Sequence, residues 1–217
     1  MSAPQRIRVW DLPTRLFHWA LAGLVTASWL SGQFGGQPWL AWHFMFGYAI
    51  LTLLVFRMLW GFAGDRYARF SSFIPSWRAA VAHVRSPRPT AGHNPLGSFS
   101  VYALLLVAGV QVMTGLYASD GDFTEGPWAI FASEATVKLL SGIHRINRWI
   151  LLALVAVHLI AIAWNTVTRH DGLVRGMLNG DKEGLNVEPA ADNRTIRLRA
   201  VVLLALSTAL VAYIVTL

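Results

Sequence analysis

The sequence predicts an all-α membrane protein with five membrane-spanning helices. Hydrophobic residues make up 55% of the 217 residues and charged residues only 13%, well below the roughly 25% charge of a soluble globular domain. The apolar segments are continuous and rich in Leu, Ala and Val, without the period-two alternation of a β-barrel, which favours helices. Segments long enough to cross a hydrocarbon core of about 30 Å as helix lie at about residues 16–32, 41–62, 96–117, 144–167 and 200–217.

The basic residues are distributed unevenly between the connections, and this asymmetry predicts the orientation of the chain. Three segments on one side of the membrane carry Arg6, Arg8 and Arg15, then Arg66, Arg69, Arg78, Arg85 and Arg88, then Arg169, Arg175, Lys182, Arg194, Arg197 and Arg199. The opposite side carries only Lys138, against Asp120, Asp122, Glu125 and Glu134. By the positive-inside rule the N-terminus is cytoplasmic and the C-terminus emerges on the far side. Topology therefore explains the net charge of +7, and nucleic acid is not an expected partner.

The first apolar segment could instead be a cleaved signal peptide, because a basic arm precedes it. Its apolar stretch is longer than a typical signal core and no small-x-small cleavage site follows, so we interpret it as a membrane helix. The chain contains no Cys, which excludes thiolate-bound zinc, iron–sulfur clusters and covalently attached haem. A redox centre would therefore have to be held by His, Met or Tyr.

Four of the seven His residues fall within or at the ends of the predicted spans: His18, His43, His144 and His158. The other three, His83, His93 and His170, fall in predicted cytoplasmic connections, where a solvated or capping role is expected. Ionisable residues inside a bilayer are rare and usually face the interior of a bundle. The directions of the helices place His18 and His158 at the cytoplasmic depth and His43 and His144 at the periplasmic depth. His144 and His158 are 14 residues apart, a rise of about 21 Å with nearly whole turns between them, so they point from nearly one face.

Two imidazoles facing each other at matched depth suit the two axial positions of a six-coordinate haem iron. An apolar slot for the porphyrin could be opened by small residues, namely Ala22, Gly23, Gly47, Ala49, Ala153 and Ala156. For the propionates, Arg145 and Arg148 suit a haem on the periplasmic side, and Arg15 and Arg57 one on the cytoplasmic side. Other interpretations remain open: the His residues could be packed or form a proton relay, and the Arg residues could anchor helix ends.

Several motifs in order resemble the bacterial cytochrome b561 family, which includes the b-type cytochrome subunits of nickel–iron hydrogenases. They are "RVWDLPTRLFHWAL", "HFMFGYAILTLLVFRMLWGF", "GHNPLG", "IHRINRWILLALVAVHLIAIAWN" and "LVRGMLNGDK", and the resemblance covers about residues 6–183. It implies a four-helix transmembrane haem-binding bundle with two non-covalent haems b. The ligands carry over to His18 with His158 and His43 with His144, the pairs that depth also gives.

The resemblance divides the chain into a di-haem domain, residues 1–183, and an additional C-terminal transmembrane helix within residues 184–217, which contains no candidate ligand. It implies electron transfer across the bacterial inner membrane between the quinone pool and a periplasmic redox partner such as a c-type cytochrome or a hydrogenase. Weak candidates for a quinone site are His93, Arg15 and Arg57.

Two alternative functions stay open. One is a free-standing oxidoreductase that passes electrons from superoxide or another small reductant to quinone. The other is a haem-free transporter that uses the His residues to move protons or ions. No catalytic residue is assigned, and whether the chain forms a homodimer is also left open.

Overall fold

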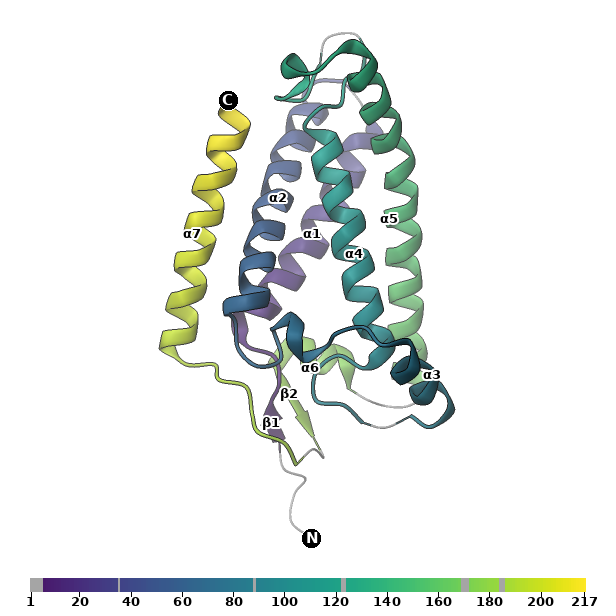
Figure 1. Cartoon of the computed structure of the whole chain (residues 1–217), viewed down its shortest axis with the longest axis vertical. Helices are drawn as coiled ribbons and strands as arrows, with labels where there is room; N and C mark the ends of the chain where they lie inside the picture. The colour runs from purple at the N-terminus through teal and green to yellow at the C-terminus, as the bar shows by residue number, and fades with distance from the viewer. Residues whose placement is uncertain (1–5, 35, 88, 122–123, 169–171, 184–185) are drawn as a thin grey trace. The chain divides into compact units, whose positions relative to one another are not determined.

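The computed structural model describes residues 6–34, 36–87, 89–121, 124–168, 172–183 and 186–217, and it confirms the predicted all-α membrane fold. Arg88, Asp122, Arg169 and His170, which belong to the predicted connections, lie outside the described residues. The long helices are α1 (Leu12–Phe34), α2 (Trp39–Ala63), α4 (Pro95–Gly115), α5 (Glu134–Thr168) and α7 (Arg194–Thr216) (Figure 1). The shorter elements are β1 (Arg6–Arg8), η1 (Phe70–Ser72), α3 (Trp77–Arg85), η2 (Ala129–Phe131), α6 (Leu173–Asn179) and β2 (Asp181–Glu183).

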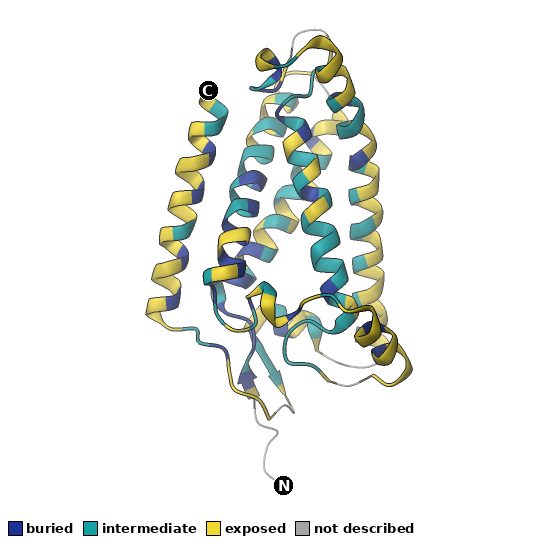
Figure 2. Cartoon of the chain, in the orientation of Figure 1, coloured by how far each residue is buried: buried dark blue, intermediate teal, exposed yellow. Residues whose placement is uncertain are grey.

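Among the described residues, four helices are long and apolar enough to cross a membrane: α2, α4, α5 and α7. Exposed residues run along α5 and α7 (Figure 2), and they include large apolar side chains such as Ile160 and Leu198, as expected for helices that face lipid. The predicted first span is present as α1, a helix of 23 residues, but it does not belong to this set because Arg15, His18 and several hydroxyl residues lower its hydropathy. That α1 crosses the membrane stays a prediction.

The helix that carries two of the four His residues is longer than the sequence indicates. α5 begins at Glu134 rather than near residue 144. The hydroxyl of Ser133 accepts from the backbone N–H of Thr136 (3.3 Å), as an N-cap residue does, and Glu134 in the first turn complements the helix dipole. His144 therefore lies well inside a helix and not at its start.

The chain forms two compact units, each assembled from three segments. The first unit contains Met1–His18, Arg57–Ala103 and Val155–Leu203; the second contains Trp19–Phe56, Leu104–Leu154 and Leu204–Leu217. His18 and His158 fall in the first unit, and His43 and His144 fall in the second. Each predicted His pair can therefore be described within one unit.

The second unit has a core to which four helices contribute. Ile50 and Leu54 of α2 and Ala108 of α4 are buried, and partly buried residues of α1 and α5, including Leu24 and Leu151, pack against them. α7 joins this unit through Val211, which packs with Leu51 and Leu116. The indole Nε1 of Trp128 donates to the carbonyl of Ile214 (2.8 Å), which holds the end of α7 in place.

The first unit contains a two-stranded antiparallel sheet that the sequence does not predict. β1 pairs with β2 in the register Arg6↔Glu183, Ile7↔Lys182 and Arg8↔Asp181. The backbone N–H groups of Val9 and Trp10 both donate to the carbonyl of Gly180 (2.8 and 3.0 Å). Gly180 ends α6 with a φ of 92°, a conformation that glycine adopts readily. The N-terminal arm is thereby fixed against the end of α6.

The expectation of a solvated or capping role is wrong for His83. His83 was expected to be solvated or capping, but it lies on α3 with only 8% of its surface exposed. α3 is amphipathic and turns Ala80 and His83 inward while Trp77 and Val84 stay exposed. The helical period therefore buries His83 on the inner face of a helix that occupies part of the predicted connection.

Candidate functional site

The second unit places the imidazoles of His43 of α2 and His144 of α5 opposite each other, with their planes nearly perpendicular. Their ring centroids are 6.2 Å apart, with an angle of 86° between the ring planes. His43 Nδ1 lies 2.8 Å from the carbonyl oxygen of Ser28, and His144 Nδ1 lies 2.9 Å from that of Gln111. A carbonyl only accepts, so in these bonds each Nδ1 carries the proton and each Nε2 keeps its lone pair. This tautomer is the one that metal-bound His adopts when a second hydrogen bond orients the ring.

Two amide side chains support the His144 end of this pair. Gln111 Nε2 donates to the backbone carbonyl of His144 (3.2 Å), and Asn147 Nδ2 donates to Gln111 Oε1 (2.8 Å) and to the carbonyl of Val107 (2.9 Å). Gln111 Nε2 also lies 3.1 Å from His144 Nε2. Sequence reasoning did not single out Gln111 or Asn147, although amide side chains inside apolar segments were a usable signal.

Glycine lets the neighbouring backbone approach both rings of this pair. A Cβ at Gly115 would lie 3.0 Å from His144 Cε1, and a Cβ at Gly32 would lie 3.1 Å from His43 Cε1. Elsewhere in the same unit, a Cβ at Gly23 or Gly47 would meet nothing within 4 Å. Gly23 and Gly47 are among the small residues expected to open a slot for the porphyrin. A flat ligand could approach the backbone closely at these two glycines.

The first unit brings together His18 of α1 and His158 of α5. Their ring centroids are 6.4 Å apart, and the ring planes make an angle of 51°. All four candidate ligands therefore occur as two facing pairs, and each pair takes one ring from α5.

The donor set and the spacing of both pairs fit a metal held between two imidazoles. A metal–imidazole bond is about 2 Å long, and the nitrogen lies about 1.1 Å from the centre of a ring with bonds of about 1.3 Å. Two imidazoles on opposite sides of one metal would then have centroids about 6.2 Å apart. The observed separations are 6.2 and 6.4 Å. Two neutral imidazoles are also a usual axial ligand set for haem iron.

Three of the four candidate Arg residues have a buried nitrogen that lacks a hydrogen-bond partner among the described residues: Arg15 Nε, Arg57 Nη1 and Arg148 Nε. Buried donors without partners are rare in native proteins and call for an explanation. The fourth candidate, Arg145, is exposed. A carboxylate-bearing ligand would supply the acceptors that these three buried nitrogens need.

The two candidate Arg residues of the first unit, Arg57 and Arg15, differ in their surroundings and in how many donors remain free for a ligand. The guanidinium of Arg57 is buried 4.7 Å from the ring centroid of Phe70 and 6.0 Å from those of Phe17 and Phe73. Arg15 already has a hydrogen-bond partner in the protein, because its Nη1 donates to the carbonyl of Leu178 (2.6 Å). Arg57 therefore has more donor capacity left for a ligand than Arg15 has.

His93, the weak quinone-site candidate, lies in the first unit among aromatic rings. Its ring centroid is 4.3 Å from that of Phe73 and 4.8 Å from that of Trp10. Burial, with the charges of Arg57 and Lys182, lowers the pKa of His93 to about 3, so the imidazole is neutral at physiological pH. The solvated or capping role expected for His93 is therefore wrong: the capping residue is the next one, because Asn94 Oδ1 accepts from the backbone N–H of Gly97 (2.7 Å) at the start of α4.

Comparisons with known proteins identify the family to which this chain is similar. A family model described as prokaryotic cytochrome b561 matches residues 9–180. The chain is 22% identical over 213 residues to the probable Ni/Fe-hydrogenase B-type cytochrome subunit of Rhizobium leguminosarum bv. viciae, covering 82% of this chain and 89% of that protein. It is 22% identical over 213 residues to the probable Ni/Fe-hydrogenase 1 B-type cytochrome subunit of Escherichia coli strain K12 (79% and 88% covered). The corresponding Cupriavidus necator subunit is 24% identical over 208 residues (79% and 85% covered).

Proposed function

Because the chain belongs to the prokaryotic cytochrome b561 family, we propose that this b-type cytochrome holds two haems b and carries electrons between the quinone pool and a periplasmic redox partner. In this proposal His18 and His158 ligate one haem iron, and His43 and His144 ligate the other. The observation that carries it is the facing of the two His pairs at 6.4 and 6.2 Å, the spacing expected for two imidazoles on one metal.

The chain's own groups would bind and orient the cofactors. When bound, each haem would supply one-electron redox chemistry. The carbonyls of Ser28 and Gln111 fix the tautomers of His43 and His144 through Nδ1. Arg148 and Arg57 have buried donors that find no acceptor in the described part of the chain and would suit propionates. A ligand set of two His leaves no iron position for oxygen, which favours electron transfer over oxygen chemistry.

The continuity of α5 supports a path for electrons through the bilayer. One unbroken helix carries both His144 and His158, and 14 residues of α-helix correspond to a rise of about 21 Å. Two haems at these depths would serve one leaflet each. We propose that the N-terminus is cytoplasmic and the C-terminus periplasmic, following the asymmetry of the basic residues.

The partner proposal rests on the relatives. Several are named as cytochrome subunits of Ni/Fe-hydrogenases, so a hydrogenase is the periplasmic partner we favour, with a c-type cytochrome as the other candidate. We further propose that residues 1–183 form the di-haem domain. The last helix, α7, would then be an addition that packs through Val211 and Ile214.

The quinone proposal can be tested with the haem-loaded protein in liposomes. Oxidised protein is mixed with decylubiquinol, and reduction of the haems is followed at the α band in a stopped-flow instrument, with dithionite giving full reduction as the reference. We expect quinol to reduce the haems. Haems that dithionite reduces but quinol leaves oxidised would contradict the coupling to quinone.

A substitution at Gln111 tests the support of the His43/His144 haem. Gln111→Leu removes the donor to the His144 carbonyl and the acceptor of Asn147. The Gln111 backbone carbonyl that accepts from His144 Nδ1 is kept, but the amide contacts that fix the His144 backbone are lost, so this haem should transfer faster to excess apomyoglobin while the His18/His158 haem is retained. Gln33→Leu, at an exposed position of α1, is the control. Equal transfer from Gln111→Leu and the control would show that Gln111 does not hold the ligand.

A further inference from the structure

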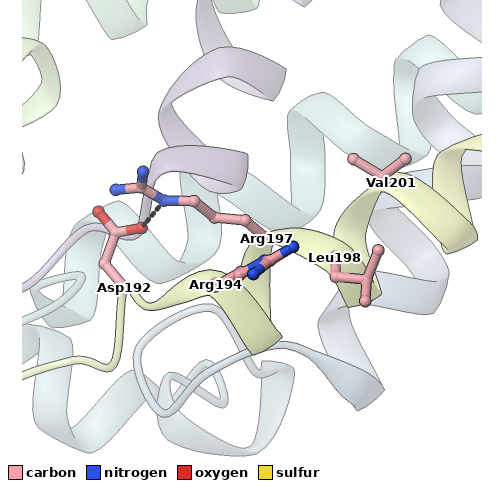
Figure 3. Close-up of a pocket in the computed structure, with 5 residues that line it drawn as sticks. All are labelled: Asp192, Arg194, Arg197, Leu198 and Val201. Atoms are coloured by element: carbon pink, nitrogen blue, oxygen red, sulfur yellow. Dashed lines mark hydrogen bonds and ion pairs between the residues drawn. The ribbon is translucent and has the colours of Figure 1, made fainter.

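The start of α7 contains a hollow that the proposed electron transfer does not use. It has a volume of about 370 Å³ and is lined by Asp192, Arg194, Arg197, Leu198 and Val201. Figure 3 shows Arg197 reaching Asp192, Arg194 extending the other way, toward Leu198, and Val201 further along the helix. All five residues belong to the first unit and lie beyond residues 9–180, which match the family model.

The charge of the hollow is positive. Asp192 accepts from Arg197 Nε (3.0 Å) and Arg8 Nη1 (2.9 Å), and Arg15 Nη2 lies 3.9 Å from it. Burial alone would raise the pKa of Asp192, but hydrogen bonds from Arg197 and the Leu12 backbone, with the charges of Arg197 and Arg8, hold this pKa below its usual value. Asp192 is thus shared among three guanidinium groups, of which Arg8 also pairs with Asp181 (2.8 Å), and no described residue forms an ion pair with Arg194.

The apolar part of the hollow lies on the same face of the helix as Arg194. Leu198 and Val201 follow Arg194 by four and seven residues, the spacing of one helical face. Both side chains are exposed, each over 62% of its surface. α7 is one of the helices long and apolar enough to cross a membrane. In a bilayer its first turn would lie near the phosphate groups, with Leu198 and Val201 toward the acyl chains.

We propose that this hollow binds an anionic phospholipid. The guanidinium of Arg194 pairs with its phosphate, for which the planar donor fork of Arg is well suited, and the neighbouring Arg197 adds to the positive charge. An acyl chain packs along Leu198 and Val201. An anionic headgroup is selected over a zwitterionic one because a headgroup ammonium would be repelled by the same Arg side chains.

Native mass spectrometry of the full, haem-loaded, delipidated chain tests this proposal. The protein is titrated with dioleoyl phosphatidylglycerol and, separately, with dioleoyl phosphatidylcholine of the same acyl chains. We expect tighter binding of phosphatidylglycerol, and we expect Arg194→Gln/Arg197→Gln to weaken its binding about tenfold while phosphatidylcholine binding stays the same. Excess inorganic phosphate should not displace the lipid, because the acyl chain supplies part of the binding.

Two matched variants separate the site from general charge effects and from misfolding. Arg66→Gln/Arg175→Gln removes the same charge from two exposed residues that pair with Glu188 and Glu183, and it should bind phosphatidylglycerol like the unsubstituted protein. Arg194→Gln alone leaves the Arg197–Asp192 bond intact and should still weaken binding. Equal affinity for the two lipids, an equal loss in the control pair, or unchanged binding in both site variants would each overturn the proposal.

Discussion

His158→Ala is expected to remove one haem and to leave the other in place. The variant removes one of two facing imidazoles, and His18, whose ring centroid is 6.4 Å from that of His158, cannot hold an iron in six-coordinate form alone. Haem measured as the pyridine haemochrome should therefore fall from about two to about one per chain. The remaining α band should be that of the His43/His144 haem, since that pair lies in the other compact unit.

Because the His residues act in pairs, the prediction also specifies which haem each variant loses. His18→Ala should give the same residual spectrum as His158→Ala, and His43→Ala and His144→Ala should share the complementary one. Leu159→Ala is the control, because Leu159 neighbours His158 on α5 and is 59% exposed; it should retain both haems. Retention of both haems in His158→Ala, or identical residual spectra in His158→Ala and His144→Ala, would contradict the assigned pairs.

A second large effect is expected from Gly115→Leu. A Cβ at this position already lies 3.0 Å from Cε1 and 3.3 Å from Nδ1 of His144, so a leucine must push the imidazole out of place. The ring would then lose its hydrogen bond to the Gln111 carbonyl and its alignment with His43. We expect the variant to lose the His43/His144 haem, as measured by haem content and by redox titration at the α band.

Three comparisons keep this result interpretable. The His18/His158 haem should be retained and so reports that the variant has folded. Gly115→Ala should keep both haems, because a single methyl requires only a few tenths of an ångström of adjustment. Met113→Leu, two residues earlier on α4 and 44% exposed, should behave as the unsubstituted protein. A Gly115→Leu protein with both haems at unchanged midpoint potentials would show that the Gly115 contact does not constrain the ligand.

Much of the fold could be predicted because apolar length in a membrane protein is a local signal. The long helices follow the apolar segments, whereas the early start of α5 depends on a cap at Ser133 that precedes the apolar run. The pairing of β1 with β2 joins residues such as Arg6 and Glu183, which are distant in sequence. Strands of three residues carry no usable alternation, so this sheet could not be foreseen.

The candidate site likewise has parts that the sequence predicts and parts that it does not. The four His residues stand out because imidazoles are unusual inside apolar segments, and their facing arrangement follows from helix direction and depth. Their orienting partners at Ser28 and Gln111 are backbone carbonyls, which every residue has and which no sequence pattern reveals. The Gln111 and Asn147 side chains did carry a signal, since amides within apolar helices need partners.

The central claim is that two facing His pairs hold two haems, and a reduced-minus-oxidised visible spectrum of the detergent-purified protein, with haem quantified per chain, tests it most directly. The account predicts about two haems b per chain with low-spin α bands, all extractable because no Cys attaches them. A chain that carries fewer than two after expression with ample haem would contradict it, and a chain with none would support the proton-relay interpretation of the four His residues.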